Sequence, residues 1–179
     1  HADRLRAAEA TGAQALETAR LGLTPSKLIT EKSVENALRV LLALGGSTNG
    51  ILHLTAIAGR CGVAITLNRL NELSDTTPVL VNLKPTGVGY MEDFNTAGAM
   101  GTLLRELQSL LHLDCPTVTG ETLGERLQAA PGFVDRTIIR SREEPFEDVG
   151  GLVALFGNLA PDGAILKRSA ADPTLFEST

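Results

Sequence analysis

The sequence has 179 residues, of which 43% are apolar and 21% charged, and its formal net charge is −5. This length suffices for one substantial hydrophobic core. The negative charge, the 3% of aromatic residues and the absence of tryptophan argue against a nucleic-acid surface, which needs clustered basic side chains and stacking rings. No apolar run approaches the roughly 18 residues of a membrane span, so we expect neither nucleic acid nor membrane as a partner.

The first residues and the two cysteines indicate the cellular compartment of the protein. The first residue is His1 rather than methionine, and no charged-then-apolar leader follows it. We therefore expect a piece of a longer cytoplasmic protein without a secretion signal. Cys61 and Cys115 lie far apart and form no Cys-x-x-Cys motif, so they predict buried structural thiols in a reducing compartment rather than a zinc or redox site.

The first third of the chain predicts three helices. Residues 3–21 are rich in strong helix formers, and this helix should end before Pro25. A second helix should start at the capping residue Thr30 and run to Gly45, and a third should follow the connection at residues 45–49. Both helices that flank this connection require burial, because their apolar residues recur at helical spacing: Val34, Ala37, Leu38, Leu41 and Leu44 before it, and Ile51, Leu52, Leu54, Ile57 and Ala58 after it.

The polar connection at residues 45–49 is the best candidate for a functional loop. Its two glycines can end one helix in the left-handed conformation, while Ser47, Thr48 or Asn49 can cap the next helix. The same segment can instead bind an anion, because a helix N-terminus has free N–H groups and a positive dipole end. Spacing alone does not choose between the two interpretations, and the three polar side chains are candidates for substrate binding.

Two β-branched runs, at residues 63–67 and 79–83, predict buried strands separated by a short helix at residues 68–73. Strands that alternate with helices usually form a mainly parallel sheet. The turn-rich loop 84–89 follows the second strand, at the edge where open α/β sheets bind ligands. Lys84 is the residue of this loop that can pair with an anion, and a solvated surface lysine is the alternative interpretation.

Two further helices are predicted at residues 96–111 and 119–130. His112 and Asp114 lie between them and are potential metal ligands, but no third ligand at suitable spacing accompanies them. His53 lies one turn into the helix after the polar connection, where a core or pocket-wall histidine is typical and a catalytic base is the alternative. The residues alone therefore predict no metal site.

Residues 131–150 begin with a Pro-Gly pair and contain an acidic run at 141–148, and we interpret this segment as a linker. Two strand-like runs follow, at 152–155 and 164–167, with an Asp-Gly pair as the tight turn between them. The predicted fold class is α/β. Helices surround a mainly parallel sheet in residues 1–130, and the first strands of a β-rich domain occupy residues 151–179.

Four motifs resemble successive landmarks of the dihydroxy-acid dehydratase and sugar-acid dehydratase superfamily. They are LLALGGSTN at residues 41–49, NLKPTG with MEDF at 82–94, DCPTVTG at 114–120 and GNLAPDGA at 157–164. Within the superfamily, the second motif, Lys167 and residues 169–173 are more similar to pentonate and hexonate dehydratases than to the branched-chain amino-acid enzyme. Phe156 departs from the pattern, since an arginine is usual there.

The resemblance implies a hydro-lyase that removes water from a 2,3-dihydroxy carboxylate, here a sugar acid such as a pentonate or hexonate. It also implies a [2Fe–2S] cluster and Mg²⁺ as cofactors, a serine base, and a homo-oligomer, either a dimer or a tetramer. The family's cluster cysteines and metal-binding lysine precede the matching stretch, and its catalytic serine follows it. No catalytic or metal-binding role is therefore assigned here, and Cys61 and Cys115 do not match the cluster positions.

Three alternatives to a sugar-acid dehydratase remain open. The first is the dihydroxy-acid dehydratase of branched-chain amino-acid biosynthesis. The second is a non-catalytic interaction or dimerisation domain, in which the acidic linker and the apolar helix pair contact a partner. The third, which does not use the resemblance, is a general anion-binding α/β domain with residues 45–49 as a phosphate cradle.

Overall fold

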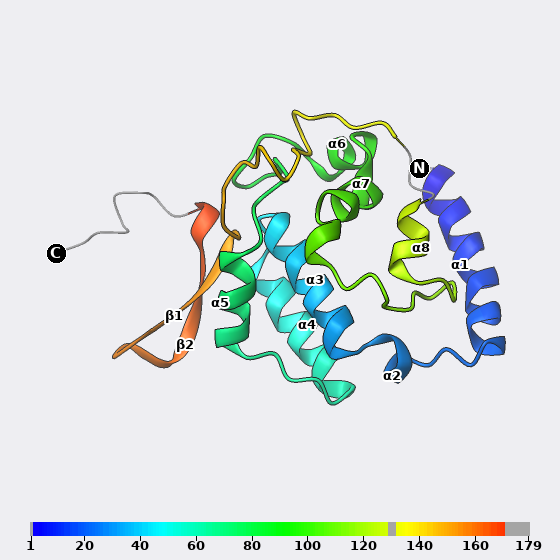
Figure 1. Cartoon of the computed structure of the whole chain (residues 1–179), viewed down its shortest axis with the longest axis horizontal. Coiled ribbons are helices and arrows are strands. Elements are labelled where there is room, and N and C mark those ends of the chain that lie inside the picture. Colours follow the sequence, from blue (N-terminus) through cyan, green and yellow to red (C-terminus); the bar gives the residue numbers. More distant parts are fainter. Residues whose placement is uncertain (1, 129–131, 171–179) are drawn as a thin grey trace.

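The computed structural model describes residues 2–128 and 132–170 and shows a mainly helical arrangement followed by a β-hairpin and a short 3₁₀ turn (Figure 1). The elements in chain order are α1 (Ala2–Arg20), α2 (Pro25–Leu28), α3 (Glu31–Ala43), α4 (Thr48–Arg60), α5 (Leu67–Asp75), α6 (Met91–Thr96), α7 (Ala99–Glu106), the 3₁₀ turn η1 (Gln108–Leu110), α8 (Leu123–Gln128), β1 (Leu152–Gly157), β2 (Ala160–Lys167) and the 3₁₀ turn η2 (Arg168–Ala170).

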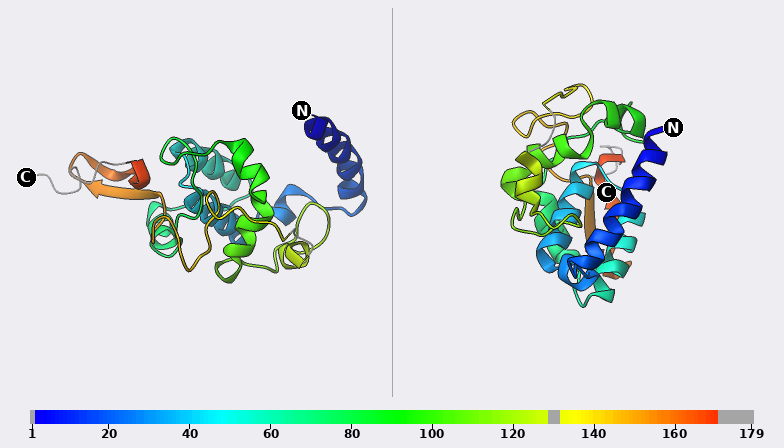
Figure 2. Two further views of the ribbon diagram at one scale, coloured as in Figure 1. Left: turned by 90° about the horizontal axis from the view of Figure 1, so that it is seen from above. Right: turned by 90° about the vertical axis from the view of Figure 1, so that its right-hand side faces the viewer.

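The first predicted helix is confirmed as α1, which stands at one end of the molecule and away from the core (Figure 2). None of its described side chains is buried, and Gln14 and Thr18 are the partly covered ones. Both side chains donate hydrogen bonds to the Val118 carbonyl, at 2.9 and 2.8 Å. Among the described residues, no helix is both long and apolar enough to cross a membrane.

Helices α3 and α4 form the pair that the apolar spacing predicts. Thr30 caps α3 as expected, because its hydroxyl accepts the Ser33 amide at 3.3 Å and its own amide donates to the Ser33 hydroxyl at 2.8 Å. The buried face of α3 packs against α4, α5 and the start of β1. This cluster contains Val34, Leu38, Leu42, Ile51, Ala58, Leu70, Leu73 and Leu152.

A second buried cluster lies beside the C-terminal end of α3 and contains Ala43, Leu80, Val81, Phe94, Ala97, Leu103, Leu107, Leu111 and Ile139. The single helix predicted at residues 96–111 is wrong in its extent, since α6, α7 and η1 share this region. Gly98 separates α6 from α7 with φ of +114°. A Cβ at this position would lie 2.3 Å from the Thr102 hydroxyl, so a glycine is required there. The helix predicted at residues 119–130 is α8, shorter at its start, and residues 129–131 lie outside the described part.

The mainly parallel sheet is the expectation that the structure corrects. Residues 63–66 are not a strand and lead directly to Thr66, the N-cap of α5. Residues 79–83 are extended and largely buried, but they make isolated bridges: Val79 with Glu147 and Val81 with Ile139, both antiparallel. Their other backbone bonds go to single residues of helices and loops, so no continuous ladder forms in the described residues. The predicted α/β class is confirmed in the sense that the described residues combine helices with a sheet, but this sheet is small and antiparallel.

The two predicted C-terminal strands pair as an antiparallel hairpin, β1 with β2, in the register Leu152 to Lys167 and Leu155 to Ala164. The turn lies at residues 158–159, because Gly157 pairs with Ala160. The expected turn at Asp162-Gly163 is therefore wrong. These residues belong to β2 at a register shift, where Gly163 has φ of +94° and the strand carries extra residues, as in a β-bulge. The division into domains at residues 131–150 stays a prediction.

Candidate functional site

The connection between α3 and α4 has the helix-ending and helix-starting geometry that its sequence predicts. Gly45 and Gly46 have φ of 72° and 46°, which ends α3 in the left-handed region. The Ser47 hydroxyl accepts the Asn49 amide at 3.2 Å and so caps α4, whose first residue is Thr48. The side chains of residues 47–49 are exposed. They are therefore accessible to a ligand beside the positive end of the α4 dipole.

Donors from three remote segments meet the carbonyl groups at the end of α3. The Leu80 amide donates to the Ala43 carbonyl at 2.9 Å, and the Gly151 amide donates to the Leu42 carbonyl at 3.3 Å. The Lys167 ammonium at the end of β2 donates to the Gly46 carbonyl at 2.8 Å. We call residues 42–46 the α3 junction. The last carbonyls of a helix have no intrahelical partner, so these long-range bonds complete the helix end.

Close backbone packing surrounds the α3 junction. A Cβ on Gly151 would lie 2.7 Å from the Gly45 Cα, and a Cβ on Gly46 would lie 2.6 Å from the Leu41 carbonyl oxygen. The Ser169 hydroxyl is also buried here, 3.7 Å from the position of a Cβ on Gly45, and has no hydrogen-bond partner in the described part of the chain. The hairpin and the α3 junction therefore touch backbone to backbone.

Lys84 lies on an exposed loop that borders the α3 junction through a neighbour. The Thr86 hydroxyl lies 3.8 Å from the position of a Cβ on Gly45. The Lys84 ammonium, however, hydrogen-bonds to the Tyr90 hydroxyl and lies 4.0 Å from the centre of the Tyr90 ring. The loop thus reaches the α3 junction while the charged group is paired with an exposed tyrosine. Sequence reasoning missed Tyr90, because no local pattern marks a partner six residues away.

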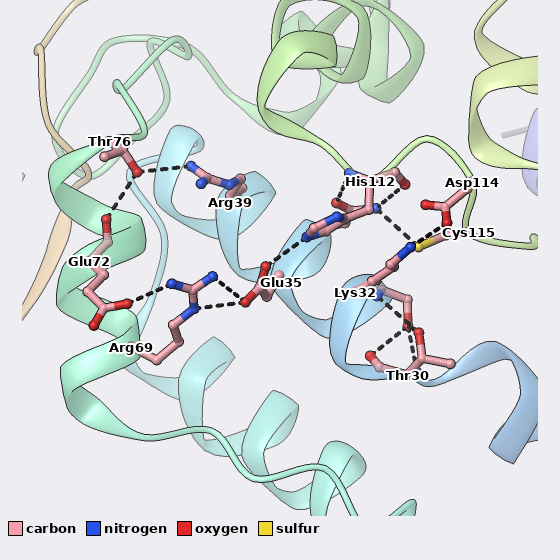
Figure 3. A network of polar contacts seen from close by, with 12 residues as sticks. Thr30, Lys32, Glu35, Arg39, Arg69, Glu72, Thr76, His112, Asp114 and Cys115 are labelled. Atoms are coloured by element: carbon pink, nitrogen blue, oxygen red, sulfur yellow. Dashed lines mark hydrogen bonds and ion pairs between the residues drawn. The ribbon is translucent and has the colours of Figure 1, made fainter.

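A polar network joins the N-terminal half of α3 to α5 and to the loop after η1 (Figure 3). Glu35 accepts from Arg69 Nε at 2.8 Å and lies 2.7 Å from His112 Nε2. Partial burial acts to raise the pKa of Glu35, but the hydrogen bonds from His112 and Arg69 outweigh it and hold this pKa below its ordinary value. Lys32 pairs with Asp114, and this bond lowers the pKa of the Asp114 carboxyl. His112 is thus a hydrogen-bond partner of Glu35, and Asp114 is a member of an ion pair.

The described residues contain no cluster of side chains that could act as ligands of the implied cofactors. Cys115 is buried, its thiol accepts a long hydrogen bond from Asn36 at 3.7 Å, and burial raises its pKa. Cys61 is the partly exposed residue at the end of α4. Nowhere in residues 2–128 and 132–170 do three His, Cys, Asp or Glu side chains come together to hold a metal ion. These residues therefore do not fit a [2Fe–2S] cluster or Mg²⁺ as ligands.

A groove of about 510 Å³ lies between α3, α4 and the segment after Asp114. His53 lines it together with Asn36, Leu54, Leu104 and Cys115. His53 is thus a wall residue of a largely apolar groove, as the first interpretation of this histidine expects. No acid or base partner of His53 is found within the described residues that line the groove.

The family of the chain follows from comparison with known proteins. Residues 1–126 match the family model described as dihydroxy-acid/6-phosphogluconate dehydratase N-terminal, and residues 137–179 match the C-terminal model of the same family. The chain belongs to this dehydratase family, as the four motifs predict.

Individual relatives carry a more specific name. A dihydroxy-acid dehydratase of Caldanaerobacter subterraneus subsp. tengcongensis is 42% identical over 98% of this chain and 32% of its own length. The dihydroxy-acid dehydratase of Methanococcoides burtonii is 42% identical over 99% of the chain and 33% of its own length. That of Desulfosudis oleivorans is 46% identical over 94% and 30%. The chain therefore spans about a third of the length of the curated relatives it matches.

Proposed function

We propose that the full-length protein containing this chain is a dehydratase that converts a 2,3-dihydroxy carboxylate into a 2-keto acid. The observation that carries the proposal is the match of both family models, in order, over almost the whole chain. In this reaction a base removes the C2 proton, the bond from C3 to its hydroxyl oxygen breaks, and the departing hydroxide leaves as water. The enol that forms tautomerises to the 2-keto acid. Both developing negative charges need stabilisation, since hydroxide is a poor leaving group.

The proposed substrate is a small dihydroxy acid of the 2,3-dihydroxyisovalerate type. The motif comparison favours a pentonate or hexonate, but the relatives are named dihydroxy-acid dehydratase, which supports the branched-chain alternative better. A [2Fe–2S] cluster and Mg²⁺, bound by parts of the protein outside this stretch, belong to the proposal. So do a homo-oligomeric state and a cytoplasmic location.

Within this enzyme, the stretch is proposed to act as scaffold and to present one substrate-facing segment. Residues 47–49 are exposed at the start of a 13-residue helix, and the Lys84 loop lies against the same junction through Thr86. Ser47, Thr48, Asn49 and Lys84 stay the proposed substrate-binding residues. Hydroxyl and amide groups at this position suit the hydroxyl groups of the substrate, and the dipole end of α4 suits its carboxylate.

The function is tested with the full-length protein, purified without air and loaded with iron, sulfide and Mg²⁺. Formation of 2-keto acid is measured with 2,3-dihydroxyisovalerate, D-xylonate and L-arabinonate. We expect the highest kcat/KM for 2,3-dihydroxyisovalerate. A higher value for either sugar acid restores the first interpretation of the substrate, and no turnover of any of the three by the loaded protein overturns the dehydratase.

The substrate-binding segment is tested by Asn49→Ala in the same protein. We expect KM to rise or kcat to fall by more than the change in stability accounts for. Asn68→Ala is the matched control, because Asn68 is also exposed and is also the second residue of a capped helix, α5. Equal kinetics of the Asn49 variant and the wild type would reduce residues 47–49 to a helix cap.

A further inference from the structure

Lys167 is a partly buried cation, and within residues 2–128 and 132–170 no acidic group forms an ion pair with it. It is the last residue of β2, and burial alone lowers the pKa of its ammonium group. In the described part of the chain, no carboxylate pairs with it. The next residue, Arg168, does have such a partner in Asp75, at 3.6 Å. Burial removes water from the ammonium group, and among the described residues the hydrogen bond to the Gly46 carbonyl compensates for this loss.

The bond to Gly46 acts at the point where α3 becomes α4. Gly46 directly precedes the cap Ser47, and its backbone is in the left-handed region. A glycine has no side chain that could fix this conformation, so its position depends on what contacts its backbone. The ammonium also lies at the negative end of the α3 dipole, where a cation is favourable. Lys167 therefore restrains the peptide that orients residues 47–49.

The hairpin does not need Lys167 in order to stay attached. Asn71 of α5 donates to the Ala154 carbonyl at 2.9 Å and accepts the Ala154 amide at 2.7 Å. The Ser74 hydroxyl donates to the Leu152 carbonyl at 2.6 Å. These bonds hold β1 against α5 at the opposite edge of the hairpin from Lys167. Removal of the Lys167 ammonium thus takes this donor away from the Gly46 carbonyl while the hairpin remains docked.

We propose that Lys167 is a positioning residue of the dehydratase, which holds Gly46 so that Ser47, Thr48 and Asn49 face the substrate. This inference rests on the proposed function. Lys167 does not itself act on the substrate. It works through one hydrogen bond to a main-chain carbonyl, and its loss should affect substrate binding more than folding.

The test compares Lys167→Met, Lys167→Arg and Arg168→Met in the full-length, cofactor-loaded enzyme. For Lys167→Met we expect KM to rise about tenfold, the factor that one charge-assisted hydrogen bond contributes, with cofactor content and melting temperature close to those of the wild type. Lys167→Arg, which keeps the charge and the donors, should recover most of the loss. Arg168→Met removes the same charge one residue later and should leave KM unchanged.

The outcomes separate the inference from the function on which it rests. An active wild type whose Lys167→Met variant keeps its KM overturns the positioning role and leaves the dehydratase standing. The same holds if Arg168→Met raises KM as much, or if Arg at position 167 restores nothing. If the Met variant does not fold, Lys167→Ala, which removes the donor and places no larger apolar group against the Gly46 carbonyl, is judged by the same change in KM. If the wild type turns over no dihydroxy acid, the proposed dehydratase function itself is overturned.

Discussion

The two ends of α3 are held by different kinds of interaction. At the N-terminal end, Thr30 and Ser33 cap the helix locally, and Lys32 and Glu35 make ion pairs near the surface. At the C-terminal end, the α3 junction is completed by main-chain amides and one lysine from remote segments, packed against glycine. Water can reach the partners of exposed or partly exposed side chains when these are replaced, whereas a buried backbone contact has no such substitute. We therefore expect mutations at the C-terminal end to lower the free energy of unfolding by more than mutations at the N-terminal end.

The largest effect is expected for Gly151→Ala at the C-terminal end. The new Cβ would lie 2.7 Å from Gly45 Cα and 2.8 Å from the Gly45 carbonyl oxygen, both backbone atoms that cannot turn aside. The hairpin would have to move away from the α3 junction, and the bond from the Gly151 amide to Leu42 would break. We expect a loss of about 3 kcal/mol in the free energy of unfolding, measured by denaturant titration.

Gly157→Ala is the matched control for this prediction. Gly157 ends β1 in the same hairpin, and nothing lies within 4 Å of the position of its added Cβ. Its cost should be within about 0.5 kcal/mol of zero. Equal destabilisation by the two alanines would show that the contact of Gly151 with Gly45 is not what makes the C-terminal end sensitive.

An intermediate effect is expected for Asn36→Ala, near the middle of α3. Asn36 is buried, donates to the His112 carbonyl at 3.0 Å and accepts the His112 amide at 2.8 Å. The alanine variant leaves both main-chain groups without this partner, which should cost about 2 kcal/mol. Thermal unfolding measures the loss, with Asn68→Ala on the surface of α5 as the control. A loss no larger than that of the control would mean that water replaces the amide fully.

The same contrast explains what could be predicted from the sequence. The Thr30 cap, the apolar face of α3 and the glycine end at Gly45 follow from local spacing, and all three are found. The bond from Lys167 to Gly46 joins residues 121 positions apart, and periodicity carries no information on such pairs. The prediction of a mainly parallel sheet was wrong for a related reason. A β-branched run such as 79–83 indicates burial and extension, but the residues that pair with it decide whether a sheet forms.

The smallest effect concerns pH at the N-terminal end of α3. The pKa of Glu35 is lower in the folded chain than in an unfolded one, because His112 and Arg69 donate to its carboxylate. The stability that this pair contributes is therefore fully present above the pKa of a free glutamate, about 4.3, and is lost as the pH falls through the lower folded value. We expect the contribution to stay under about 1 kcal/mol.

Unfolding of the wild type and of Glu35→Gln between pH 7 and about pH 3, below the pKa of a free glutamate, measures this contribution. The wild type should lose its advantage over the variant on acidification, because a glutamine cannot ionise. Lys32→Ala should have the smallest effect and leave the melting temperature unchanged. Both side chains of the ion pair between Lys32 and Asp114 are exposed, so this pair contributes little to stability. A constant advantage of Glu35 at all pH values would mean that ionisation of its carboxyl group is not what stabilises the N-terminal end.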